Sequence, residues 1–268
     1  MRCVLSGLTG AALAISAAGP ASADELVLYA AGSLREAMAQ IARDFHARTG
    51  ITVRAEFGPS GVMRERIEKG ERVDLLASAD MGHPLRLERQ GQASAVVMFA
   101  RNSVCAFSTA RVGLTTSSLL DVLIDPGVTL GTAAAGTDPL GDYTLQLFKR
   151  ADALRPGAGA TLTGKARVLI GGATQPPAGQ DLVATSLKDR TVDVFLAYCS
   201  GRSRLEAQVA HLTVTALPDN LRVGPEYGVA LLKGAQPQAA ALMLYILSAA
   251  GQTTLARHGF APVAMPAP

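Results

Sequence analysis

The sequence has no tryptophan, few aromatic residues (4%) and little excess charge of either sign. Lys and Arg total 25 against 22 Asp and Glu, a formal net charge of +3, which excludes a nucleic-acid binder that neutralises many phosphates. After residue 23, no uninterrupted apolar run reaches about 18 residues, so we expect the mature chain to be soluble. Hydrophobic residues make up 49% of the 268, too many for a disordered chain and enough for a sizeable core.

Motifs for metal, nucleotide or acid–base chemistry are also scarce. No two histidines form H-x-x-x-H, so zinc catalysis is unsupported; the four are His46, His83, His211 and His258. Residues 159–165 fit the phosphate-loop pattern G-x-x-x-x-G-K, but Ala166 replaces the hydroxyl residue that would hold Mg²⁺. We therefore expect a protein that is not an enzyme and has no cofactor.

The first 23 residues have the pattern of a secretory signal peptide. Arg2 precedes an apolar stretch from about Val4 to Ala18, and an Ala-Ser-Ala cleavage site ends at Ala23. The alternative is a membrane anchor, but the stretch is shorter than the roughly 20 residues that span a bilayer. We expect export to the periplasm and a mature chain of residues 24–268.

Two cysteines remain in the mature chain, and export allows them to pair. Cys105 and Cys199 both lie in strand-like runs. A bridge between them would close a loop of about 94 residues and stabilise the fold by roughly 4 kcal/mol in the chain-entropy model. Two separately buried thiols are the alternative, and the sequence leaves the choice open.

Strand and helix patterns alternate along the chain. Leu26–Ala31 is a continuous apolar run typical of a buried strand, and the helical pattern that follows repeats its apolar residues at i, i+3, i+4 and i+7. This alternation predicts an α/β fold with parallel, doubly wound sheets. The Gly/Pro-rich stretches 156–164 and 171–179 are expected to be surface loops, and the tail 238–259 a helix broken near Gly251.

Hydroxyl side chains follow two of the predicted strands. Ser33 and Ser60 each stand between a strand and a helix, where a serine commonly caps the helix. The other interpretation is that several helix N-termini meet at one cleft and bind an anion through free N–H groups. The turn at 137–141 could add backbone donors and Tyr198 a phenol donor, unless Tyr198 is a core residue whose hydroxyl is already satisfied.

These stretches resemble the molybdate-binding proteins of bacterial ABC importers, within the type II periplasmic binding protein fold. The resemblance covers most of the mature chain and is carried by these motifs: LVLYAAGSLREAM (26–38), FGPSGVMRERIEKGERVDLLASAD (57–80), DPLGDY (138–143), VFLAYCSG (194–201), EYGVALL (226–232) and HGF (258–260). It implies two α/β lobes joined by a hinge. We assign residues 24–103 and 222–268 to lobe 1 and residues 104–221 to lobe 2.

The resemblance also implies an oxyanion, molybdate or tungstate, held between the lobes by hydrogen bonds alone. Ser33, Ser60 and Tyr198 would be oxyanion contacts rather than direct metal ligands, and Leu140 would offer a backbone N–H. A further backbone donor is expected near Gln180, where this sequence departs from the family pattern; Leu140 also replaces a smaller residue. The implied partners are the membrane subunits of an ABC importer, and the receptor is expected to be a monomer.

Two other functions remain open at this stage. A receptor for a different anion, such as a small carboxylate, would be favoured by an arginine in the cleft. A secreted hydrolase with Ser60 as its nucleophile would need a histidine within hydrogen-bond reach, and none is near in sequence.

Overall fold

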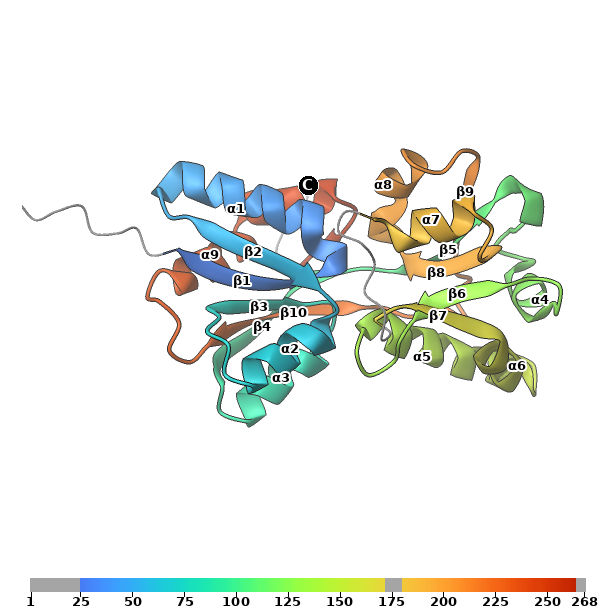
Figure 1. The fold of residues 1–268 in the computed structure, drawn as a ribbon, viewed down its shortest axis with the longest axis horizontal. Helices are drawn as coiled ribbons and strands as arrows, with labels where there is room; N and C mark the ends of the chain where they lie inside the picture. The colour runs from blue at the N-terminus through green and yellow to red at the C-terminus, as the bar shows by residue number, and fades with distance from the viewer. Residues whose placement is uncertain (1–24, 172–179, 264–268) are drawn as a thin grey trace, which may run out of the picture.

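Two lobes lie side by side, and each has its own β-sheet covered by helices (Figure 1). The computed structural model describes residues 25–171 and 180–263, so the expected signal peptide lies outside the described residues. Within these ranges, lobe 1 has a six-stranded sheet in the order β11 (Ala261–Pro262), β4 (Ala93–Arg101), β10 (Glu226–Leu232), β3 (Leu75–Ser78), β1 (Leu26–Ala31) and β2 (Val53–Gly58). Lobe 2 has a five-stranded sheet in the order β7 (Ala166–Ile170), β6 (Leu130–Ala133), β8 (Val194–Tyr198), β5 (Val104–Thr109) and β9 (Leu212–Ala216).

Helices cover both faces of each sheet (Figure 1). The helices of lobe 1 are α1 (Arg35–Thr49), α2 (Ser60–Glu68), α3 (Gly82–Arg89), α9 (Ala239–Leu247) and α10 (Ala249–Arg257). Those of lobe 2 are α4 (Leu119–Ile124), α5 (Pro139–Leu154), α6 (Ala158–Lys165), α7 (Leu182–Lys188) and α8 (Arg202–Glu206). Short 3₁₀ turns occur at η1 (Gly32–Leu34), η2 (Ala110–Val112) and η3 (Cys199–Gly201). The apolar stripe of α1 is buried against the sheet, as its spacing predicts.

The α/β fold with two lobes is confirmed, but the sheets are mixed rather than parallel. Strands β1, β2 and β3 pair in parallel, whereas β10 runs antiparallel to both β3 and β4. In lobe 2, β5 is likewise antiparallel to β8 and β9. The antiparallel strands β5 and β10 are those by which the chain enters lobe 2 and re-enters lobe 1: β4 leads into β5 of the other sheet, and β9 leads into β10.

The chain crosses between the lobes at those same two places. The first crossing lies between Arg101 and Val104, and the return lies between Ala216 and Glu226. The boundaries proposed from the sequence, after residues 103 and 221, fall on these connections. Two adjacent connections of this kind form a hinge, about which one lobe can rotate relative to the other.

One local expectation was wrong. Most of the predicted loop 156–164 is helix α6, because the Asp152 carboxylate accepts hydrogen bonds from Gly157 N and Gly159 N and Leu162 is fully buried. The tail is broken near Gly251 as expected, at Ser248. The hydroxyl of Ser248 accepts a hydrogen bond from Gly251 N and so begins a new helix. The second predicted loop, 171–179, lies outside the described residues except for Gly171.

Cys105 and Cys199 form a disulfide, with their Cα atoms 5.1 Å apart. Cys105 is the second residue of β5, just after the first crossing, and Cys199 directly follows β8. The bridge therefore joins the hinge side of β5 to the end of the strand that carries Tyr198. In the described part of the chain, no single helix is long and apolar enough to cross a bilayer; α9 and α10 pass that test only together, and they are bent by 62°.

Candidate functional site

Ser33 lies in η1, which connects the end of β1 to α1. Its side chain does not cap a helix, so the capping interpretation is wrong for this residue. Instead, its hydroxyl lies 3.1 Å from the hydroxyl of Tyr227, on β10. Ser33 is partly exposed, whereas Tyr227 is fully buried. The serine therefore stands between a buried polar group and the space between the lobes.

Ser60 is the first residue of α2 and is fully buried. Its side chain does not cap α2 either. The hydroxyl oxygen accepts a hydrogen bond of 3.1 Å from the backbone N–H of Ala79, just after β3. Because this bond uses the oxygen and not the proton, the Ser60 hydroxyl can still donate one hydrogen bond.

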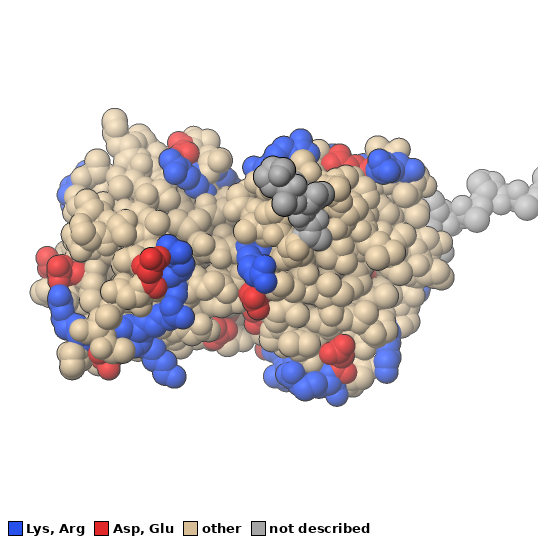
Figure 2. Space-filling model, turned by 180° about the vertical axis from the view of Figure 1, so that it is seen from behind, with Lys and Arg blue, Asp and Glu red and all other residues tan. Residues whose placement is uncertain are grey.

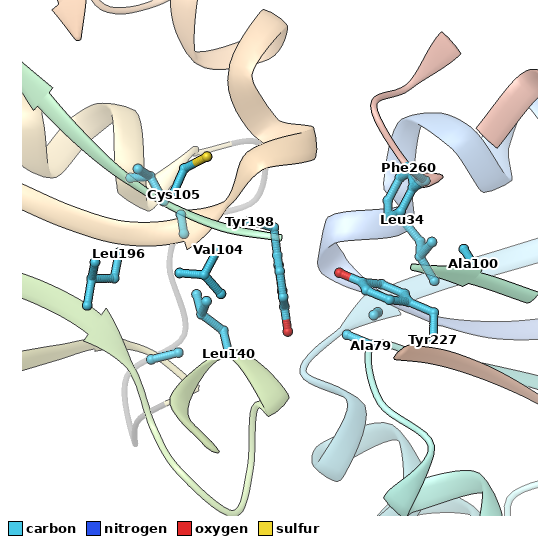
Figure 3. Packing of buried hydrophobic residues seen from close by; sticks show 14 of the residues in the cluster. Leu34, Ala79, Ala100, Val104, Cys105, Leu140, Leu196, Tyr198, Tyr227 and Phe260 are labelled. Atoms are coloured by element: carbon cyan, nitrogen blue, oxygen red, sulfur yellow. The ribbon is translucent and has the colours of Figure 1, made fainter. Parts of the chain in front are cut away.

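Tyr198 ends β8 at the edge of lobe 2 that faces lobe 1, and its hydroxyl points toward the first turn of α5, in its own lobe (Figure 3). It is 7% exposed, and its hydroxyl has no hydrogen-bond partner among the described residues. The alternative, a core tyrosine with a satisfied hydroxyl, is right about the burial of Tyr198 and wrong about its hydroxyl. Burial raises the pKa of Tyr198 well above 10, so the phenol keeps its proton and can donate it.

Leu140 lies in the first turn of α5, but its backbone N–H is already in use. The Asp138 carboxylate, at the N-cap of α5, accepts a hydrogen bond of 2.9 Å from Leu140 N. Burial raises the pKa of Asp138 to about 6, helped by the nearby carboxylates of Asp142 and Asp80. An anion bound at Leu140 N, the donor that the resemblance implies, would meet this carboxyl group.

Gln180 is exposed and is the first residue described after the gap at 172–179. The helix that follows, α7, is capped by Asp181, which accepts hydrogen bonds from Val183 N and Ala184 N. The two N–H groups at this helix start are thus already occupied. A ligand contact at Gln180 stays a prediction.

The two lobes touch at the candidate site. Gly61 N, in the first turn of α2, donates a hydrogen bond of 2.9 Å to the carbonyl oxygen of Thr137, directly before the Asp138 cap. The rings of Tyr198 and Tyr227, one from each lobe, lie 5.7 Å apart in an edge-to-face arrangement (Figure 3). These contacts bring the chain around Ser33, Ser60, Tyr198 and Leu140 together at one contact region between the lobes. We call this region the seam.

A cavity of about 330 Å³ opens beside this seam. It is lined by residues of both lobes and of the return crossing, including the carboxylates of Asp80, Asp142 and Glu226. None of the five predicted ligand residues lines it, and no arginine does. Nor do the described residues contain a group of three or more His, Cys, Asp or Glu that could hold a metal ion.

Three residues at the seam were missed from the sequence: Asn102, Asp138 and Tyr227. Asn102 lies on the first crossing, between two strand-like runs, and the sequence shows a polar residue there without showing that it is buried. Its side-chain nitrogen donates hydrogen bonds to Tyr227 Oη (3.2 Å) and to Ser200 Oγ (2.9 Å). Asp138 begins the DPLGDY motif, and its position before Pro139 is typical of a helix cap.

Comparison with known proteins assigns a family. The model of the family described as bacterial extracellular solute-binding protein matches residues 26–261. The chain belongs to this family. An uncharacterised protein of Pasteurella multocida is 33% identical to this solute-binding protein over 207 residues, 76% of this chain and 85% of the relative. The molybdate-binding protein ModA of Mycobacterium bovis is 26% identical over 257 residues, 92% of this chain and 89% of its own.

Solved structures of similar fold are more distant in sequence. The periplasmic molybdate-binding protein of Azotobacter vinelandii has a TM-score of 0.71 at 17% identity, covering 90% of this chain and 100% of its own. The sulfate-binding protein SubI of Mycobacterium tuberculosis has a TM-score of 0.74 at 17% identity, covering 89% and 87%. PEB3 of Campylobacter jejuni, solved with L-phospholactate, has a TM-score of 0.70 at 15% identity, covering 89% and 100%. These neighbours establish the two-lobed fold of the solute-binding protein.

The family description, an extracellular solute-binding protein, indicates a solute-binding role. On the face seen in Figure 2, basic and acidic side chains lie in small mixed groups around the two lobes. This distribution agrees with the small net charge, and with a protein that attracts a small anion locally rather than through its whole surface.

Proposed function

We propose that this solute-binding protein is a monomeric receptor that captures a tetrahedral oxyanion, molybdate or tungstate, between its lobes. The receptor would then deliver the anion to the membrane subunits of an ABC importer. The observation that carries the proposal is the pair of hydroxyls on opposite lobes, Ser60 and Tyr198, that can still donate at the seam.

The chemistry of these groups suits an anion. Burying a charged ligand is costly unless hydrogen-bond donors surround it. Hydrogen bonds to a charged partner are about twice as strong as neutral ones, so a few directed hydroxyl and N–H donors can compensate. Ser33 and Ser60 form hydrogen bonds with neutral groups, a phenol and a backbone amide respectively.

The fold supports the transport role. Closing a hinge around a ligand buries the ligand and changes the outer surface that a membrane partner meets. Hydrogen bonding between Gly61 and Thr137 joins the lobes directly beside the donors. Occupancy of the cleft and closure of the lobes would therefore be coupled.

Titration calorimetry of the mature protein with molybdate, tungstate, sulfate and phosphate tests the proposal. We expect heat and a saturable 1:1 isotherm with molybdate and tungstate, and weaker binding of the smaller sulfate. An isotherm without heat for both large oxyanions would refute the molybdate assignment.

A receptor for a different anion is the second candidate, and Asp138 favours it. An ionised carboxylate that occupies Leu140 N opposes an anion that can only accept hydrogen bonds, but it could accept a hydrogen bond from an anion that keeps a proton, such as hydrogen phosphate. A small-carboxylate receptor is less well supported, because the cavity beside the seam has no arginine among its lining residues. Tight binding of phosphate in the same titrations would select this candidate.

A further inference from the structure

Asn102 lies at the hinge and contacts both lobes. Its nitrogen Nδ2 carries two protons, and two oxygens lie within hydrogen-bond distance of it. Tyr227 Oη of lobe 1 is 3.2 Å away, and Ser200 Oγ of lobe 2 is 2.9 Å away. Asn102 is 7% exposed, so these bonds compete with little water.

The orientation of the Asn102 amide is fixed by a third bond. Its oxygen Oδ1 accepts a hydrogen bond of 2.8 Å from Ser103 N. A backbone N–H can only donate, so the atom facing it must be the amide oxygen. The NH₂ group must therefore face Tyr227 and Ser200, and Tyr227 Oη must accept.

The direction of the next bond follows from the phenol group. One oxygen lone pair of a phenol is conjugated with the ring, which leaves one good acceptor site and one O–H donor. Asn102 occupies the acceptor site of Tyr227. The 3.1 Å contact between Tyr227 and Ser33 is then a bond in which the phenol donates and the serine oxygen accepts.

We propose that Asn102 and Tyr227 are positioning residues that direct the Ser33 hydroxyl as a donor into the cleft. With its oxygen occupied by Tyr227, Ser33 keeps its own proton for a ligand, just as Ser60 does with its oxygen on Ala79 N. We call the hydrogen bonds from Asn102 to Tyr227 and from Tyr227 to Ser33 the relay. The relay makes the site select ligands that only accept hydrogen bonds, and it disfavours ligands that present an O–H or N–H to Ser33. This role rests on the proposed anion-binding function. Asn102 and Tyr227 determine whether the Ser33 hydroxyl donates to the ligand.

The relay predicts a specific pattern of affinity in a double-mutant cycle at pH 8. In Asn102→Asp a carboxylate that accepts replaces the amide that donates, at nearly the same volume. Tyr227 then donates to residue 102 and accepts from Ser33, so Ser33 loses its free proton. We expect the Kd for molybdate, or for whichever tested oxyanion binds most tightly, to rise at least tenfold.

In the Tyr227→Phe background there is no relay, so Asn102→Asp is expected to weaken binding less than threefold further. An equal loss in both backgrounds would mean that the new charge, and not the direction of the relay, weakens binding, and would overturn the proposal. Unchanged affinity in Asn102→Asp would overturn it too. Asn220→Asp, an exposed position on the return crossing, is the matched control for the added charge.

A measurement without ligand separates this proposal from the proposed function. In NMR spectra of the ligand-free protein we expect a slowly exchanging hydroxyl proton of Tyr227 with a nuclear Overhauser contact to the β-protons of Ser33. The Tyr227→Phe variant must lack this signal. A Tyr227 hydroxyl that exchanges at the rate of free tyrosine would refute the relay, even if the wild type binds molybdate. A protected hydroxyl in a protein that binds none of the four anions would refute the proposed function and keep the relay.

Discussion

The hydroxyl of Ser60 has a structural and a proposed binding role, and one substitution separates them. Its oxygen accepts from Ala79 N, and its proton is assigned to the ligand. We expect Ser60→Ala to weaken anion binding at least about tenfold, which corresponds to loss of one charge-assisted bond of about 1.5 kcal/mol. We also expect about 1 kcal/mol lower stability in the ligand-free state, because Ala79 N loses its partner.

Calorimetry gives the first quantity and urea unfolding the second. Ser117→Ala, an exposed serine in lobe 2, is the matched control and should change neither. Affinity equal to wild type, alongside the stability loss, would show that Ser60 has only the structural role.

Asp138 introduces a pH dependence. Its pKa is raised from the ordinary 3.8 to about 6, so the folded state binds the proton more tightly than the unfolded state does. The stability from this group is therefore present below about pH 4 and is lost as pH rises through about 6. A shift of about two units corresponds to at most about 3 kcal/mol.

Asp138→Asn removes the charge but keeps an oxygen that can cap Leu140 N. We expect the variant to be more stable than wild type at pH 8 by about 1 to 3 kcal/mol and nearly equal to it at pH 4, in urea unfolding at both pH values. A difference that is the same at both values would mean that Asp138 does not titrate in this range.

Local sequence patterns predicted most elements but not their pairing. Strands such as β1 and helices such as α1 follow directly from their apolar spacing. The antiparallel placement of β10 could not be predicted, because it depends on where the chain re-enters lobe 1 after more than 100 residues. Helix α6 was missed because its glycines are typical of a loop. The helix is capped by the Asp152 carboxylate of α5, a contact that the local pattern does not show.

The same distinction holds for the site. Ser33, Ser60 and Tyr198 could be named because each stands at the end of a strand, where ligands bind in α/β sheets. Asn102 and Tyr227 could not, because their role depends on contacts across 125 residues of sequence. The hydrogen bond between the Asp138 carboxylate and Leu140 N could not be predicted either, because it depends on the direction of the Asp138 side chain.

At the first turn of α2, the missing side chain of Gly61 allows the lobes to touch. A Cβ atom there would lie 2.6 Å from Thr137 O, a backbone atom of the opposite lobe that cannot move aside cheaply. Alanine is otherwise better than glycine in a helix by about 1 kcal/mol. We therefore expect Gly61→Ala to keep or raise the stability of the protein while it weakens closure.

The prediction is at least a tenfold loss of anion affinity and a larger radius of gyration in X-ray scattering with ligand present. Gly164→Ala in α6, where an added Cβ meets nothing within 4 Å, is the matched control and should leave both unchanged. Wild-type scattering and affinity in Gly61→Ala would show that the Gly61–Thr137 contact is not needed for closure.

Across the whole molecule, the disulfide restricts the unfolded chain while it connects two elements at the hinge. The bridge spans a sequence separation of 94 residues, for which the chain-entropy model gives a stabilisation of about 4 to 5 kcal/mol. We expect the Cys105→Ser, Cys199→Ser double variant to lose about this much stability in urea unfolding, and the reduced wild type to match it. A variant as stable as the oxidised protein would contradict this mechanism.

Anion affinity should respond much less to loss of the bridge. The β5–β8 ladder and the 2.8 Å hydrogen bond from Cys199 N to Ser103 O still hold the end of β8, and with it Tyr198, in place. We expect less than a threefold change in Kd at low urea for the double variant, by calorimetry. A loss of affinity comparable with the Ser60→Ala effect would instead show that the bridge positions Tyr198, because Cys199 is the residue next to it. The two measurements together thus separate a bridge that stabilises the fold from one that shapes the site.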